Sequence, residues 1–111
     1  MDLQYSIDEL FFNALYGKKI NNLSKLLNEH PEFATKPICG VSPLYIATST
    51  SKIDPVFITL LLENGAQKDI NNPSFETYRT PIDNLDYYNV PNKDEILELF
   101  SRYTYPTLST S

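Results

Sequence analysis

Few side chains in this sequence could do chemistry. There is one cysteine, Cys39, and one histidine, His30. A catalytic thiol needs a base within hydrogen-bond reach, and Cys39 lies in a loop beside Gly40 with no base near it in the sequence. His30 comes directly before Pro31, where a helix must end, so we expect it to cap the last carbonyls of that helix. One cysteine and one histidine also exclude a disulfide scaffold and a zinc module.

Carboxylate pairs are the remaining candidates. Asp83 and Asp86 share one face of a predicted helix, so they could hold a cation or act as an acid–base pair. Carboxylates at a helix start more often stabilise the positive end of its dipole, and we expect that role here and at residues 8–9. Residues 69–72 lack the glycine and the terminal glutamate of a calcium loop. We therefore predict no catalytic, metal-binding or cofactor-binding residue, and no enzyme.

The balance of charged residues limits the classes of partner that the chain could bind. Nine Lys or Arg residues stand against fourteen Asp or Glu, which gives a net charge of −5. The basic residues are scattered, and only Lys18 and Lys19 are adjacent. Because affinity for nucleic acid and anionic lipid comes from clustered cations, we expect neither a nucleic-acid nor a membrane partner. Three glycines leave no room for a glycine-rich phosphate loop.

Targeting signals are not visible in the sequence. Its first residues are acidic rather than basic, and the longest apolar stretch, 56–62, is far shorter than the roughly twenty residues of a membrane span. A free thiol favours a reducing compartment. We therefore expect a cytoplasmic protein.

The elements that position these residues repeat along the chain. Leucine-rich helical patterns cover 20–27, 53–62 and 94–100, and their final apolar pairs recur about every 35 to 38 residues. Ser42-Pro43-Leu44 also recurs as Thr80-Pro81-Ile82. A hydroxyl residue followed by proline is a helix-start signal, since the hydroxyl caps free N–H groups and proline fits the first helical position. The pattern therefore predicts that each unit forms a capped helix, a turn and a second helix.

The three second helices differ in pattern. Those at 20–27 and 94–102 are amphipathic, whereas 56–62 is apolar nearly all round, which indicates burial on several sides. A short stack of repeats predicts this arrangement, with a covered middle unit between two outer units. An irregular helical bundle or a tetratricopeptide-type repeat would give a similar period.

The segments 40–47 (GVSPLYIA) and 60–66 (LLLENGA) resemble the two halves of an ankyrin repeat. The unit 73–103 carries Thr80-Pro81-Ile82, and the unit 5–36 matches only at a few positions. The resemblance implies an all-α, helix-turn-helix repeat solenoid of about three stacked units with long connecting loops. We predict one domain over 1–103, with units at about 5–36, 37–72 and 73–103, and a flexible tail at 104–111.

Resemblance to this family implies a scaffold that binds another protein without catalysis, as an inhibitor or an adaptor, and that is monomeric when unbound. Partners would meet its concave face and loop tips. Tyrosine and arginine dominate interface hot spots. We therefore expect Tyr78, Tyr87 and Tyr88, together with Arg79, to form an exposed binding patch on this face. The alternative is a structural subunit or homo-oligomer that packs through its apolar end faces. Carried over by position, the partner-binding residues are Tyr16, Ser49, Thr50, Phe75, Glu76, Tyr78, Arg79, Tyr87 and Tyr88.

Overall fold

The computed structural model describes residues 7–38 and 40–104, and within them the chain is helical with no strand. The predicted all-α class is confirmed for these residues. Two short 3₁₀ helices, η1 (Pro31–Ala34) and η2 (Ala66–Asp69), follow the second and fourth α-helices. The α-helices are α1 (Ile7–Tyr16), α2 (Ile20–Glu29), α3 (Pro43–Ala47), α4 (Pro55–Glu63), α5 (Pro81–Tyr87) and α6 (Lys93–Thr104).

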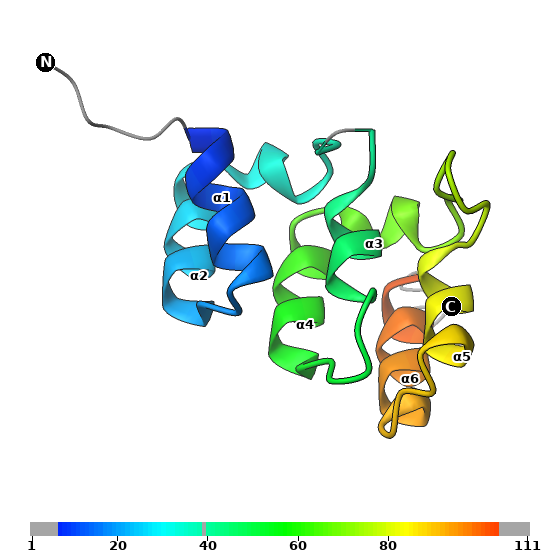
Figure 1. The fold of residues 1–111 in the computed structure, drawn as a ribbon. Coiled ribbons are helices and arrows are strands. Elements are labelled where there is room, and N and C mark those ends of the chain that lie inside the picture. Colours follow the sequence, from blue (N-terminus) through cyan, green and yellow to red (C-terminus); the bar gives the residue numbers. More distant parts are fainter. Residues whose placement is uncertain (1–6, 39, 105–111) are drawn as a thin grey trace, which may run out of the picture.

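Consecutive helices form three pairs that stand side by side (Figure 1). Helices α1, α3 and α5 form one layer, which we call the α1–α3–α5 layer. Helices α2, α4 and α6 form the second layer behind it. Neighbouring helices pack on one another within each layer, and each pair packs across the two layers. The α1–α3–α5 layer therefore presents one continuous face.

The helix starts follow the predicted local signals. The Ser42 hydroxyl accepts a hydrogen bond from the Tyr45 N–H at 3.1 Å, and α3 begins with proline. Thr80 and Asp83 form a reciprocal capping box at the start of α5, with both bonds at 3.0 Å. The expected helix starts at Pro43 and Pro81 are thus confirmed. The carboxylate of Asp83 is used in capping.

Helix α4 lies at the centre of the core. Phe57, Ile58, Leu61 and Leu62 are buried, as the all-apolar pattern predicts. Val56, in the first turn, is the exception because 52 % of it is exposed. The flanking helices bury one stripe each. These stripes include Leu23 and Leu27 on α2, and Ile96, Leu99 and Phe100 on α6.

The turn between α1 and α2 depends on a lysine in an unusual backbone conformation. Lys18 has a φ of 58°, in the left-handed region of the backbone that residues other than Gly, Asn and Asp seldom adopt. The neighbouring Gly17 permits a close approach instead, since a Cβ there would lie 2.8 Å from the Asn13 carbonyl oxygen. The turn therefore fixes the direction in which the Lys18 side chain leaves the backbone.

Within residues 7–38 and 40–104, no helix combines the length and the apolar character needed to cross a bilayer.

Candidate protein-binding surface

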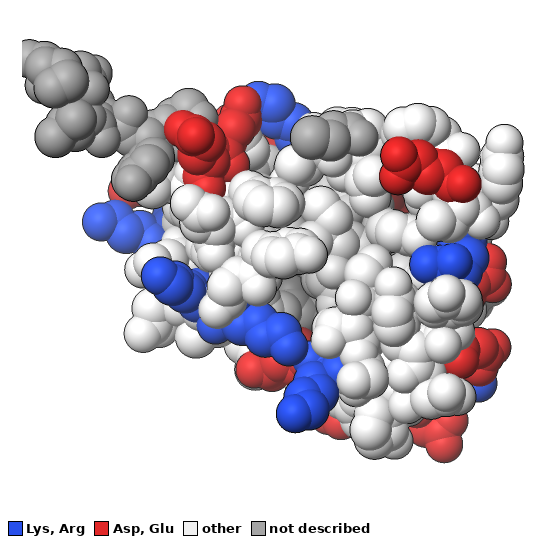
Figure 2. All heavy atoms as spheres, in the orientation of Figure 1, with Lys and Arg blue, Asp and Glu red and all other residues white. Residues whose placement is uncertain are grey.

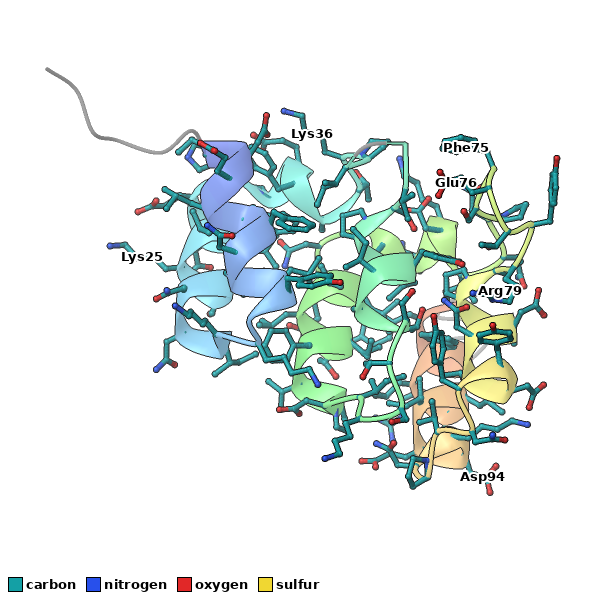
Figure 3. The ribbon with its side chains drawn as sticks, viewed as in Figure 1. Lys25, Lys36, Phe75, Glu76, Arg79 and Asp94 are labelled. Carbon is teal, nitrogen blue, oxygen red and sulfur yellow. The ribbon has the colours of Figure 1, made fainter. Side chains whose placement is uncertain are left out.

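The residues predicted to bind a partner all come from the α1–α3–α5 layer and the loop that precedes α5 (Figure 3). Tyr16 ends α1, Ser49 and Thr50 follow α3, Tyr87 ends α5, and Tyr88 is the C-cap residue after it. The remaining predicted residues lie in the 73–79 loop: Phe75, Glu76, Tyr78 and Arg79. The structure therefore places the whole predicted set on or beside one face.

A compact cluster of aromatic rings and one guanidinium occupies the α5 end of this face. The guanidinium carbon of Arg79 lies 3.8 Å from the ring centre of Tyr87 and 5.9 Å from that of Tyr88. The two tyrosine rings meet edge to face at 4.9 Å. Tyr78 and Tyr87 are 79 % and 60 % exposed. We call Tyr78, Arg79, Tyr87 and Tyr88 the tyrosine–arginine patch.

A buried asparagine supports the patch from below. Asn84 is fully buried, and its Oδ1 accepts a hydrogen bond from Arg79 Nε at 3.0 Å. Its Nδ2 donates to three oxygens near the end of α3: the Tyr45 carbonyl (3.4 Å), Thr48 Oγ1 (3.2 Å) and Ser49 Oγ (3.3 Å). Asn84 therefore ties α5 to α3 and also fixes Arg79 against Tyr87.

The sequence around Asn84 does not predict that its side chain joins α5 to the end of α3. An asparagine in a short helix is expected on the surface, because amide side chains are mostly exposed. Its partners at and just after the end of α3 lie 35 to 39 positions earlier in the chain. No local spacing signals a bond over that distance.

Besides the bond from Arg79 to Asn84, two contacts fasten the 73–79 loop to the rest of the layer. The hydroxyls of Tyr45 and Thr77 share a hydrogen bond of 2.6 Å. The Phe75 ring lies against Gly40, where an added Cβ would stand only 2.7 Å from the ring. Phe75 nevertheless remains 62 % exposed. One edge of its ring thus anchors the loop while the rest faces solvent.

A groove lies between the first two helix pairs on the same face. Its volume is about 260 Å³, and Tyr16, Ser49 and Thr50 are among the residues that line it. Tyr16 is 70 % exposed and its ring stacks on Phe12, with ring centres 5.1 Å apart. The predicted residues therefore fall into two sets, one at the groove and one in or beside the tyrosine–arginine patch.

The acidic pair that could have done chemistry is engaged in structural contacts. Asp83 belongs to the capping box of α5, and Asp86 forms an ion pair with Lys93 at the start of α6. The hydrogen bond that Lys93 Nζ donates to the Asp86 carboxylate, together with the negative charge of Asp86, raises the pKa of Lys93. Asp8, at the start of α1, pairs with Lys36 at 2.9 Å.

The other chemical candidates are also accounted for where the structure describes them. The backbone N–H of His30 closes the end of α2 by donating to the Leu26 carbonyl at 2.7 Å. Its imidazole faces Phe33, and its Nδ1 lies 3.7 Å from the Glu32 carboxylate. Cys39 lies outside the described residues. Across 7–38 and 40–104, no group of three or more His, Cys, Asp or Glu side chains is arranged to hold a metal ion.

Asp69 is a buried carboxylate that sequence spacing alone did not single out. Its Oδ1 accepts a hydrogen bond from Asn72 Nδ2 at 3.1 Å. Both residues line a small pocket of about 70 Å³ beneath the 73–79 loop, together with Ser74. The pair therefore helps to shape the base of that loop.

No protein-family model, no curated protein and no solved structure matches this chain. The ankyrin resemblance therefore stays a hypothesis that rests on the motifs at 40–47 and 60–66.

Proposed function

We propose that this chain is a non-catalytic protein-binding module, built as an ankyrin-like stack of three helix pairs. It binds a partner protein through the α1–α3–α5 layer and the 73–79 loop. The order of the helix pairs, the Ser/Thr-Pro starts of α3 and α5 and the buried middle helix α4 all support the stack.

The observation that carries the binding role is the tyrosine–arginine patch. Exposed Tyr87 stands beside an arginine whose guanidinium is already stacked on its ring, and exposed Tyr78 directly precedes that arginine in the chain. Tyrosine and arginine are enriched at hot spots because they combine a large contact area with hydrogen bonding. Exposing aromatic rings to water is unfavourable, and these rings add nothing to the core. An exposed aromatic cluster therefore favours a role in recognition.

The patch is also ordered before binding. Arg79 is held by Asn84 on one side and by Tyr87 on the other. Binding a flexible arginine costs about 0.5–1.5 kcal/mol in lost side-chain freedom, and a prearranged arginine avoids part of that cost. The patch can therefore bind without rearranging, as an inhibitor or an adaptor would.

A pair of substitutions tests the proposal. Tyr78→Ser with Tyr87→Ala removes the two most exposed rings of the tyrosine–arginine patch and leaves the buried Asn84 side chain in place. Val56→Ala, on the other layer, is the control because it also truncates an exposed apolar side chain. Each tagged variant is used to copurify proteins from cells of the source organism, followed by quantitative mass spectrometry.

We expect the double variant to lose the proteins that the wild type and Val56→Ala retain. Hot-spot truncation of about 2 kcal/mol reduces affinity roughly thirtyfold, which is enough to remove most partners from a wash. Equal thermal unfolding of all three proteins would exclude misfolding. Retention of the same proteins by the double variant would refute the site. A stable dimer by sedimentation would favour the homo-oligomer instead.

A further inference from the structure

The groove between α1 and α3 has a chemical character that the tyrosine–arginine patch lacks. Its base is apolar, formed by buried Leu15, Ile53 and Phe57. Half-buried Ile46 and Ala47 of α3 form one wall. At about 260 Å³, the groove is smaller than the roughly 300–1,000 Å³ of sites for drug-sized ligands. Its size therefore suits one bulky side chain of a partner better than a whole cofactor.

Two lysines border the groove. Lys18 and Lys52 line it, and Lys18 Nζ donates to the Lys52 backbone carbonyl at 2.9 Å. Figure 2 shows Lys and Arg side chains gathered along the lower edge of a hollow on this face. The left-handed backbone of Lys18 and this hydrogen bond direct one ammonium along the groove edge. The groove therefore carries its positive charge at a fixed place.

These ammonium groups remain available to an incoming carboxylate. The ion pairs among the described side chains use other cations, namely His30, Lys36, Lys93 and Arg102. Neither Lys18 nor Lys52 pairs with a carboxylate within the described residues. Asp54 also lines the groove, but its Oδ1 accepts a hydrogen bond from the Val56 N–H at 2.9 Å, as the cap of α4.

The loop that carries Lys52 is held in place. Asn92, at the start of α6, donates from Nδ2 to the Ile53 carbonyl at 3.1 Å. Ile53 itself is buried in the core. The wall formed by residues 49–54 is therefore fixed from behind, and the groove does not depend on a free loop.

We infer that this groove binds an acidic peptide segment of the partner protein, with one bulky apolar side chain in the groove and neighbouring carboxylates on Lys18 and Lys52. The inference rests on the proposed function, since Tyr16, Ser49 and Thr50 of the predicted surface line this groove. Apolar contact supplies affinity, and the two lysines supply selectivity for an acidic segment. On a chain with a net charge of −5, this local positive edge is what allows an acidic segment to approach.

The test uses synthetic peptides and the full-length chain. One peptide has a phenylalanine flanked on both sides by glutamates. The second keeps the phenylalanine with serine flanks, and the third keeps the glutamates with alanine in place of phenylalanine. Binding is followed by amide chemical shifts in two-dimensional NMR, which locate each peptide on the surface and give its Kd.

Charge-removing variants complete the design. Lys18→Asn keeps a residue that tolerates the left-handed backbone, and Lys52→Gln is at an exposed position. Lys25→Gln is the matched control, because Lys25 lies on α2 at the outer edge of the molecule (Figure 3). All three variants change the charge by one unit without touching the core.

We expect the glutamate–phenylalanine peptide to bind with a Kd below about 1 mM and to shift the amides of Leu15, Ala47 and Ile53. The double variant Lys18→Asn with Lys52→Gln should weaken it about three- to tenfold, since each exposed pair contributes modestly. Lys25→Gln should leave the Kd unchanged. Added salt should weaken binding to the wild type and have less effect on the double variant.

Three results would overturn the inference. They are equal binding of the serine-flanked peptide, equal binding of the alanine peptide, and no shift at the groove with any peptide. Shifts confined to the Tyr87 region are one form of the last result, and they would reject the groove while leaving the proposed function intact. The two claims stay separable because the copurification test depends on Tyr78 and Tyr87, whereas this one depends on Lys18 and Lys52.

Discussion

Removing the Asn84 side chain should destabilise the fold by an amount that the structure allows us to work out. Asn84→Ala breaks the 3.0 Å bond to Arg79 and three longer bonds to α3. A hydrogen bond to a charged group contributes about 1.5–3 kcal/mol, and the longer neutral bonds contribute less. Alanine regains about 0.5 kcal/mol as a better helix former. We expect the free energy of unfolding to fall by about 2 kcal/mol.

Urea denaturation monitored by circular dichroism measures this change. A loss of about 2 kcal/mol lowers the ratio of folded to unfolded chains about thirtyfold. Asn28→Ala, on the exposed surface of α2, is the matched control and should change stability by less than about 0.5 kcal/mol. If the two variants were equally stable, the reasoning would be refuted, because Asn84 would then not join α3 to α5.

Two further predictions concern a helix cap and a tyrosine. Thr80→Ala removes the capping box with Asp83 and should cost about 1 kcal/mol in urea denaturation, whereas Ser101→Ala on the surface of α6 should cost little. The pKa of Tyr103 is raised above its ordinary 10.0, first by burial and then by the negative charge of Glu63. The hydrogen bond that the Tyr103 hydroxyl donates to Glu63 raises it further. Glu63→Gln should therefore lower that pKa, read from the Tyr103 ring carbon by NMR. Because the pKa of Tyr103 is higher in the folded state, its protonated hydroxyl contributes to the free energy of unfolding. That contribution is fully present below pH 10.0 and is lost as the pH rises through the raised pKa.

Local features of the fold could be predicted from the sequence because their causes are local. The caps at Ser42 and Thr80 act within three residues of the helix that they begin. The apolar stretch at 56–62 predicts a central helix, since such a surface has to be covered by several neighbours. Only Val56 departs from this, because it lies in the first turn of α4, where 52 % of it stays exposed.

The details of the surface could be predicted only in part. The ankyrin resemblance predicts that Arg79, Tyr87 and Tyr88 lie on one side of the molecule, and the structure stacks the Arg79 guanidinium on the Tyr87 ring. The groove could not be foreseen in this way. It depends on the left-handed turn at Lys18 and on a bond from Lys18 to a backbone carbonyl 34 positions away. Neither leaves a pattern in nearby residues, since a lysine is an unusual choice for that conformation.

The two parts of the surface are joined through the end of α3. Ser49 lines the groove, donates to the Tyr45 carbonyl at 2.7 Å and accepts from Asn84 at 3.3 Å. Asn84 in turn holds Arg79 of the tyrosine–arginine patch. A short chain of hydrogen bonds thus fixes the distance between the groove and the patch. A partner that contacts both would meet two prearranged sites at a set spacing, which favours its binding as one body without loss of freedom between the sites.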